Sequence, residues 1–310
     1  MRALALTRGE IDVSERGAFA RLHEGRRCSF LQSDHGVHAC EIHNTAGHAA
    51  LPITCRMFPR QVLHDPRGTF ISLSHYCPTA AGMLFDDDGP VGIVDAPASL
   101  TGDGVLDGLD ARDVWPPVLR PGVMMDLESY TAWEQRAIEL LTRSGIAPRV
   151  ALRALSDVTA RIAQWTPSEG LPLEHAVLDA FGMLAPPPTA ELAPEDPAVK
   201  RWLAARLFGT WLAYQGNALG TIVRYLHACH DVFSVELARD RNPREAIRRC
   251  DQLIVHESSS QQLAILLNSK ESEDSKKGEG APSIFDTSKG RRSKEILRSP
   301  SKTSTPSSSG

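Results

Sequence analysis

Apolar residues recur at helical spacing through the second half of the chain. The first stripe follows Asp126 and comprises Tyr130, Trp133, Ala137, Leu140 and Leu141. Intervals of three and four residues predict a helix that ends near Ser144 and Gly145. A second stripe follows Pro148, which suits the first turn of a helix, and comprises Ala151, Leu155, Val158, Ile162 and Trp165.

The same periodicity predicts further helices over 171–184, 198–214 and 221–239, and a last one from Asn242 and Pro243 to about Leu267. Prolines crowd the stretch from Pro186 to Pro197, and since they prevent a helix, this stretch should be an extended linker. We therefore expect a helical bundle over residues 126–268.

The first half has a different pattern. Two apolar runs between Val62 and Leu73 flank Asp-Pro-Arg-Gly at 65–68, which predicts a hairpin. This hairpin would carry Cys77 back towards Cys55, and residues 79–84 would then start a short helix. The stretch 11–22 is expected to be partly helical.

Residues 86–125 are rich in Gly, Asp and Pro without the ligand order of a calcium-binding EF-hand, so we expect a connecting loop region. The predicted fold is mainly α: a small loop-rich cysteine-cluster module with a short hairpin (1–85), the connecting region, the helical bundle, and a tail (269–310). Lys, Glu, Ser, Gly and Pro dominate the tail, and this composition predicts disorder.

Charge separates the tail from the body. The chain has 34 basic and 38 acidic residues, and the tail holds nine of the basic and six of the acidic ones. The rest of the chain is therefore acidic, with 25 basic and 32 acidic residues. Because affinity for phosphate backbones comes largely from Lys and Arg, nucleic acid is not expected as a partner. The sequence contains no run of eighteen apolar residues and no export signal over Met1–Val13, so we expect no membrane span and a cytoplasmic location.

Candidate chemistry is concentrated in the first half, where four of the six cysteines lie. Cys28, Cys40, Cys55 and Cys77 are isolated, with eleven, fourteen and twenty-one residues between them. Four thiolates gathered by folding would complete the shell of one zinc ion or hold one [4Fe–4S] cluster.

Their spacing favours the iron–sulfur cluster. Structural zinc sites usually take cysteines in closely spaced pairs, which are absent here. A cubane cluster accepts ligands singly, and Cys77-Pro78 also has the form that ends the bacterial ferredoxin motif. Zinc stays open as the alternative metal, and buried core cysteines or two disulfides remain alternatives to any metal.

The segments around these cysteines resemble a known family. They read Cys28-Ser-Phe-Leu; Cys40-Glu-Ile-His with Gly47; Leu51-Pro-Ile-Thr-Cys55-Arg-Met-Phe-Pro-Arg60; and Ser72-Leu-Ser-His-Tyr-Cys77-Pro-Thr-Ala-Ala. Over residues 27–84 this series is similar to the cysteine-cluster proteins described as zinc- or iron-chelating, and closest to the flagellin lysine-N-methylase type. Family members commonly carry a further cysteine motif upstream, so this sequence either starts downstream of it or has lost part of the site.

The resemblance implies a bound metal centre and methyl transfer to protein lysines. S-adenosylmethionine would be the methyl donor, and a lysine-bearing protein such as flagellin the substrate. Arg56 and Arg60 follow a ligand candidate directly, and a guanidinium can hold a carboxylate such as that of the methyl donor. Their alternative role is to neutralise the charge of the thiolates.

Other candidates have plainer roles. His43, His64 and His75 are alternative ligands or hydrogen-bond donors to ligands. Cys229 and Cys250 fall on apolar helical stripes and are predicted to be core residues, and His227 and His230 are predicted to be core or surface side chains.

Three functions therefore remain: a metal-centre enzyme that methylates protein lysine, a non-catalytic iron–sulfur or zinc protein with a structural or redox-sensing role, and a helical interaction protein with a metal-stapled module. The sequence has no dinucleotide-binding glycine motif, no P-loop and no His-Glu-x-x-His. Enzymatic activity is thus implied by the resemblance alone.

Overall fold

The computed structural model describes residues 11–14, 17–20, 22–23, 27–34, 37–86, 89, 91–96, 106–167, 170–185, 192–214 and 218–256. The chain divides into two units, Met1–Gln252 and Leu253–Gly310, and everything below concerns the first. The tail predicted to be disordered, 269–310, lies outside the described residues, as does the end of the last predicted helix.

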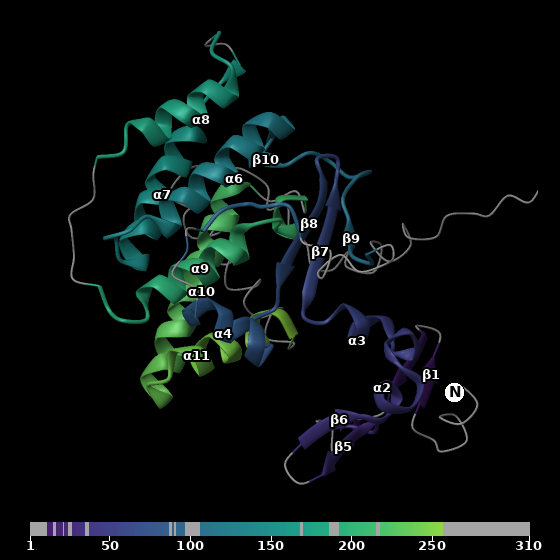
Figure 1. Cartoon of the computed structure of the whole chain (residues 1–310). Coiled ribbons are helices and arrows are strands. Elements are labelled where there is room, and N and C mark those ends of the chain that lie inside the picture. The colour runs from purple at the N-terminus through teal and green to yellow at the C-terminus, as the bar shows by residue number, and fades with distance from the viewer. Residues whose placement is uncertain are drawn as a thin grey trace, which may run out of the picture. The chain divides into compact units, whose positions relative to one another are not determined.

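The fold is mainly helical with a few small sheets, as predicted. The long helices of the second half are α6 (Leu127–Thr142), α7 (Pro148–Ile162), α8 (Leu173–Gly182), α9 (Asp196–Leu207), α10 (Leu219–Asp240) and α11 (Pro243–Asp251) (Figure 1). Helix α6 packs against α7, α8 and α9, while α10 packs against α7, α9 and α11. No helix among the described residues is long and apolar enough to cross a membrane.

The predicted stripes form most of the core between these helices, but Trp165 of the second stripe lies beyond the end of α7 and is only half-buried. All five residues of the first stripe are at most 2% exposed. Trp133 of α6 also donates its indole N–H to Thr159 Oγ1 of α7 at 3.2 Å. Helix α6 begins where the side chain of Asp126 accepts from the amide of Ser129, and α11 where Asn242 accepts from Glu245. Both are N-cap contacts that satisfy otherwise unpaired amides.

One predicted helix is shorter than expected. The segment 198–214 forms α9 only to Leu207, followed by a 3-10 turn at Trp211–Tyr214. Gly209 separates the two with φ of +57°, and a Cβ there would lie 3.0 Å from Phe70. A left-handed residue this close to its neighbour favours glycine and ends the helix.

The predicted hairpin is β7 (Arg60–Asp65) and β8 (Gly68–Leu73), with the turn at 65–68 as expected. Strand β9 (Leu109–Asp110) adds to β7 in parallel. Gly108 allows this approach, because a Cβ there would lie 2.5 Å from the carbonyl oxygen of Val62. The rest of 106–125 includes the short pair β10 (Val118–Arg120) and β11 (Val123–Met124).

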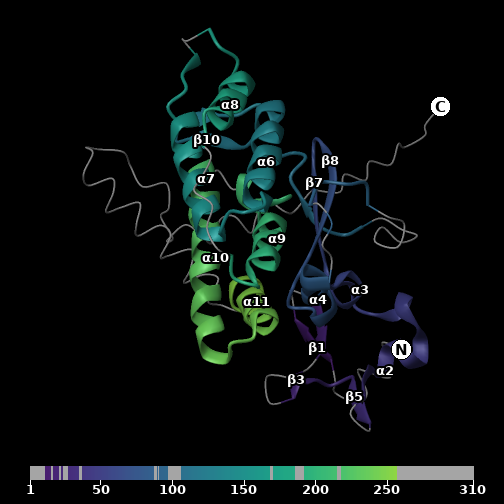
Figure 2. The ribbon, with the colours of Figure 1, turned by 60° about the vertical axis from the view of Figure 1, so that its left-hand side comes forward.

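Helix α4 (Pro78–Asp86) follows the hairpin and buries Ala80, Ala81 and Leu84. It packs against α9 and α11, and Figure 2 shows it beside α11. The short helix predicted over 79–84 is therefore confirmed, with one residue more at its start and two more at its end.

The N-terminal part consists of short antiparallel pairs: β1 (Ile11–Ser14) with β2 (Gly17–Ala20), β3 (Leu22–His23) with β4 (Arg27–Cys28), and β5 (Leu31–Asp34) with β6 (Val37–Cys40). Helices α2 (Glu41–Ala46) and α3 (Ile53–Met57) follow. The prediction of a partly helical segment over 11–22 was wrong. Ile11 and Val13 alternate with Asp12, which is the period of a strand.

Candidate metal centre

The open end of the β7–β8 hairpin joins the segments that carry Cys55 and Cys77. Cys55 lies in α3, five residues before β7, and Cys77 lies four residues after β8. The amide of Ser74 donates to the carbonyl of Pro59 at 2.7 Å, which extends the hairpin beyond its strands. The rings of Phe58 and Tyr76 then meet edge to face, 6.4 Å between centroids.

Cys28 and Cys40 are brought together by a second hairpin. Cys28 ends β4, and Cys40 ends β6 opposite Leu31, the first residue of β5. The amide of Glu41 donates to the carbonyl of Phe30 at 2.9 Å, which ties the turn after Cys28 to the residue after Cys40. Local pairing therefore explains why two cysteines with eleven residues between them lie in one small region.

Electrostatics link three of the four thiols. Burial raises the pKa of the Cys55 thiol, a hydrogen bond to Thr54 lowers it, and charge on Cys28 and Cys40 raises it further. Negative charge on one of these thiols is thus felt by another, as expected for groups that share a region. Such mutual repulsion is relieved when a cation binds to the thiolates.

The four cysteines do not form a coordination shell in the described structure. Among the described residues, no group of three or more His, Cys, Asp or Glu side chains is placed to hold a metal ion. All four thiols are free; Cys55 is exposed, and Cys28, Cys40 and Cys77 are half-buried. Four free thiols fit a soft metal or an iron–sulfur cluster as a donor set.

The two arginines after Cys55 have different environments. Arg60 donates to the carbonyls of Arg56 and Met57 and so caps the C-terminal end of α3. The Nε of Arg56 is buried and has no hydrogen-bond partner among the described residues. Arg56 therefore keeps a donor for a ligand, whereas Arg60 uses part of its guanidinium to hold the backbone.

The three histidines also differ. His64 uses both ring nitrogens, with Thr69 Oγ1 at 2.9 Å and the carbonyl of Leu106 at 2.8 Å, which gives it a structural role in the hairpin. The ring of His43 lies against that of His48. His75 is buried, only 4% exposed, in the loop that leads to Cys77.

Cys229 and Cys250 are fully buried on α10 and α11. Burial raises the pKa of Cys229 to about 12 and that of Cys250 above its ordinary range. They are core residues, as predicted from their stripes. His230 is also buried, and His227 is half-buried with Nε2 2.9 Å from Ser156 Oγ.

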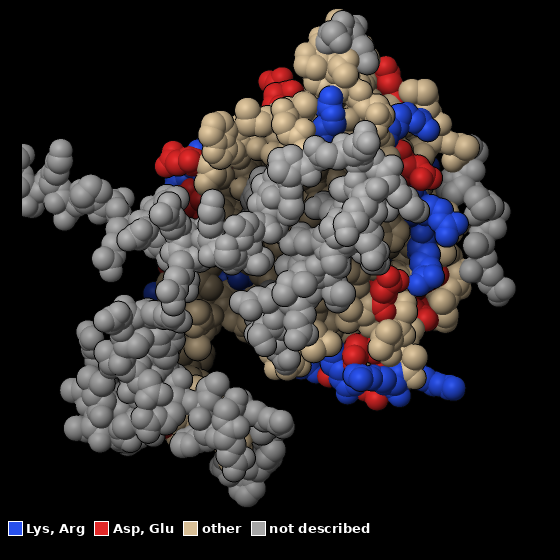
Figure 3. Space-filling view, turned by 180° about the vertical axis from the view of Figure 1, so that it is seen from behind, with Lys and Arg blue, Asp and Glu red and all other residues tan. Residues whose placement is uncertain are grey.

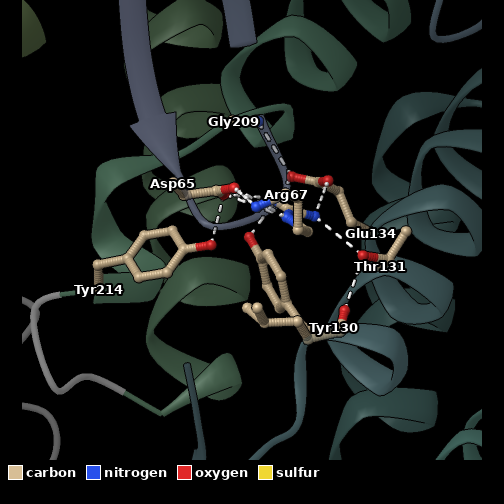
Figure 4. A network of polar contacts seen from close by, with 8 residues as sticks. Asp65, Arg67, Tyr130, Thr131, Glu134, Gly209 and Tyr214 are labelled. Carbon is tan, nitrogen blue, oxygen red and sulfur yellow. Dashed lines mark hydrogen bonds and ion pairs between the residues drawn. The ribbon is translucent and has the colours of Figure 1, made fainter. Parts of the chain in front are cut away.

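A polar network at the other end of the hairpin was not foreseen from the sequence (Figure 4). Arg67, in the β7–β8 turn, pairs with Asp65 at 2.8 Å and with Glu134 of α6 at 2.9 Å. Tyr214 donates to Asp65 at 2.5 Å, and the amide of Gly209 donates to Glu134 at 3.0 Å.

The charges in this network are buried and mutually compensated. Burial lowers the pKa of Arg67, but Glu134 and Asp65 raise it well above its usual value. Burial raises the pKa of Glu134, with Arg67 opposing. The guanidinium also lies over the rings of Phe70 and Tyr130, at 4.5 and 4.9 Å. The network fixes the turn of the hairpin to α6, and the hairpin in turn positions the cysteine segments.

The sequence did contain a signal for this network. Glu134 lies four residues after Tyr130 and three before Ala137, so a charged residue interrupts the apolar stripe of α6. A charge on a buried face needs a partner. Its partner, Arg67, is 67 residues away in the sequence, and no local pattern identifies it.

No family model, no curated protein and no solved structure matches the chain. The resemblance to the cysteine-cluster family therefore stays a prediction from the motifs.

Proposed function

We propose that the chain binds one metal centre through Cys28, Cys40, Cys55 and Cys77, and that the centre is an iron–sulfur cluster. The observations that support the proposal are the four free thiols and the charges of Cys28 and Cys40, which raise the pKa of the Cys55 thiol. Neither Cys55 nor Cys77 belongs to the ladder of the β7–β8 hairpin, so both segments can adjust to a metal without breaking that ladder.

The wide spacing of the cysteines supports iron–sulfur over zinc, because a cubane cluster offers one iron to each thiolate. The same chain with zinc would be a structural or redox-sensing protein. Metal and acid-labile sulfide analysis of protein purified without oxygen separates the two outcomes. Iron with sulfide supports the cluster, zinc without sulfide supports the alternative, and absence of both contradicts the metal centre.

Matched variants locate the centre. Cys55→Ser should lower the metal content, whereas Cys229→Ala should keep it, because Cys229 is a core residue. Equal metal content in Cys55→Ser and the parent, together with the same result for Cys28→Ser, Cys40→Ser and Cys77→Ser, would contradict the site.

As its activity we propose methyl transfer from S-adenosylmethionine to lysine in a protein such as flagellin, on the strength of the motif resemblance. A cluster held by these cysteines would supply an iron able to bind the amino and carboxylate groups of the methyl donor. Arg56 supports the proposal, because its buried Nε keeps a free donor next to Cys55. That iron would need a position without a thiolate, so either one of the four Cys→Ser variants should keep the cluster or a fifth group should share the site.

An acidic body suits a lysine-bearing substrate, since an opposite field raises the encounter rate. On the face drawn in Figure 3, however, Lys and Arg are interspersed with Asp and Glu, so the acidic excess forms no single patch there. Steering is therefore a property of the whole charge of the body rather than of that face.

The activity test is incubation of the reconstituted protein with S-adenosylmethionine and flagellin from the same cell, followed by mass analysis of lysine. Mass gains of one or more methyl groups are expected, and Arg56→Gln should weaken binding of the methyl donor more than Arg60→Gln. An intact cluster with reductant, no methylation and no binding of S-adenosylmethionine would leave the non-catalytic metal protein.

A further inference from the structure

Helix α11 contacts the loop that presents Cys77. This loop, Ser74–Cys77, lies between β8 and α4, and α11 packs against α4 (Figures 1 and 2). The amide of His75 donates to Asp251 Oδ2 at 2.6 Å, and Arg248 Nε donates to the carbonyl of Tyr76 at 3.1 Å. Two side chains of one helix therefore hold neighbouring main-chain groups of the loop.

The spacing of these two residues explains how one helix does both. Arg248 and Asp251 are three residues apart on α11, so they lie on the same face. Arg248 also lies over the ring of Tyr76, 5.8 Å from its centroid. Arg248 binds the carbonyl of Tyr76 and Asp251 binds the amide of His75, so the loop has little freedom to rotate.

Asp251 is held in place by side chains of α9 as well as by the loop. It is 0% exposed, and its Oδ1 accepts the indole N–H of Trp202 at 2.9 Å and lies 3.8 Å from Arg206. Burial alone would raise the pKa of Asp251, but Arg206 together with the bonds from His75 and Trp202 lowers it to about 2. A charged carboxylate thus connects α9, α11 and the loop.

The ring of His75 faces the same carboxylate. His75 Nδ1 lies 3.7 Å from Asp251 Oδ2 and has no hydrogen-bond partner among the described residues. Asp251 therefore has both the main chain and the side chain of this residue within reach. Cys77 is two residues further along the chain, so the position of His75 limits where the thiol can lie.

We propose that Asp251 and Arg248 are positioning residues of the metal centre, which hold the Ser74–Cys77 loop so that the Cys77 thiolate meets the other ligands. This inference rests on the proposed function. Its physical basis is that metal ligands on loops depend on surrounding hydrogen bonds for their orientation. The contacts predict that α11, far from Cys77 in sequence, controls how firmly metal is held.

Arg248 gives the cleaner test, because its side chain is 25% exposed and its loss should not unfold the chain. Its matched control is Arg249, the next residue of α11, whose guanidinium pairs with Glu236 and Asp240 instead of with the loop. Arg248→Gln and Arg249→Gln make the same change of charge on the same helix. Asp251→Asn is the second variant, since it removes the charge while keeping the shape.

The first measurement is hydrogen exchange of a peptide covering 72–80 in the full chain without metal. Arg248→Gln and Asp251→Asn should exchange faster there than the parent, and Arg249→Gln should not. The second measurement is the rate at which a chelator removes iron from the loaded full-length protein. Loss should be about ten-fold faster in Arg248→Gln and Asp251→Asn than in Arg249→Gln, with an altered visible spectrum.

These measurements separate the two claims. Iron binding by the parent with equal loss rates and equal spectra in all variants would overturn the positioning role and leave the proposed function intact. Absence of any metal in the parent would overturn the proposed function and the positioning role with it. In that case the exchange data still report whether α11 holds the loop. Unchanged exchange in both Arg248→Gln and Asp251→Asn would overturn the inference outright.

Discussion

The amide of Ser74 donates to the carbonyl oxygen of Pro59 at 2.7 Å, so the open end of the β7–β8 hairpin joins two cysteine segments. At the other end, Arg67 anchors the turn of the hairpin to α6. We therefore expect order at the Cys55 and Cys77 segments to depend on the buried ion pairs of Arg67. The predictions below test this dependence and the roles of the core.

Arg67→Met should destabilise the fold strongly. The substitution leaves Asp65 and Glu134 buried, each with one partner fewer, and breaking a buried pair in this way costs about 3–5 kcal/mol. Urea unfolding of the metal-free chain measures this loss. Arg136→Met on α6 is the control: its guanidinium pairs with Glu139 at the surface, so its effect should stay within about 0.5 kcal/mol. Similar effects of the two substitutions would show that the network does not stabilise the hairpin.

The sequence predicted the helices and the hairpin because local patterns determine both. Tyr130 and Trp133 mark the buried face of α6, and the Asp-Pro-Arg-Gly turn marks the hairpin. The roles of Asp251 and Arg67 depend on partners distant in sequence. Asp251 lies four residues after Ile247 on the apolar face of α11, which signals a buried charge. Only folding shows that it meets Trp202 and the loop before Cys77.

Gly108→Ala should separate β9 from β7. A Cβ at this position would lie 2.5 Å from the carbonyl oxygen of Val62, so the strands must move or the backbone must strain. Overpacking of this kind costs about 1–3 kcal/mol. Thermal unfolding of the variant and of the control Gly92→Ala, where a Cβ would meet nothing within 4 Å, tests this. An unfolding temperature equal to that of the control would show that β9 pairs only loosely.

Cys250→Ala should cost about 1–2 kcal/mol from lost burial and leave metal content intact. Its thiol and that of Cys229 are fully buried, so neither should react with iodoacetamide in the folded, metal-free chain. Cys55 is exposed and should react first. Peptide mapping after brief labelling gives the order of reaction, and early labelling of Cys250 would mean that α11 opens readily.

Acid should remove the stabilising contribution of Asp251. The pKa of this carboxyl is lowered to about 2 in the folded chain, as its ion pair with Arg206 and its hydrogen bonds outweigh burial. A lowered pKa stabilises the fold above the pKa of the unfolded chain, near 4, and this stabilisation disappears as the pH falls towards 2. The contribution at neutral pH is about 2 kcal/mol.

Asp251→Asn should therefore differ most from the parent at pH 7, and the difference should shrink by about 2 kcal/mol as the pH falls from 5 to 2. Unfolding free energies of the metal-free proteins at intervals of pH measure this directly. Asp231→Asn is the control, because Asp231 pairs with Arg149 at the surface and its removal should keep the pH dependence of the parent. A difference between Asp251→Asn and the parent that stays constant with pH would mean that the variant loses packing rather than charge, and that Arg206 finds its compensation elsewhere.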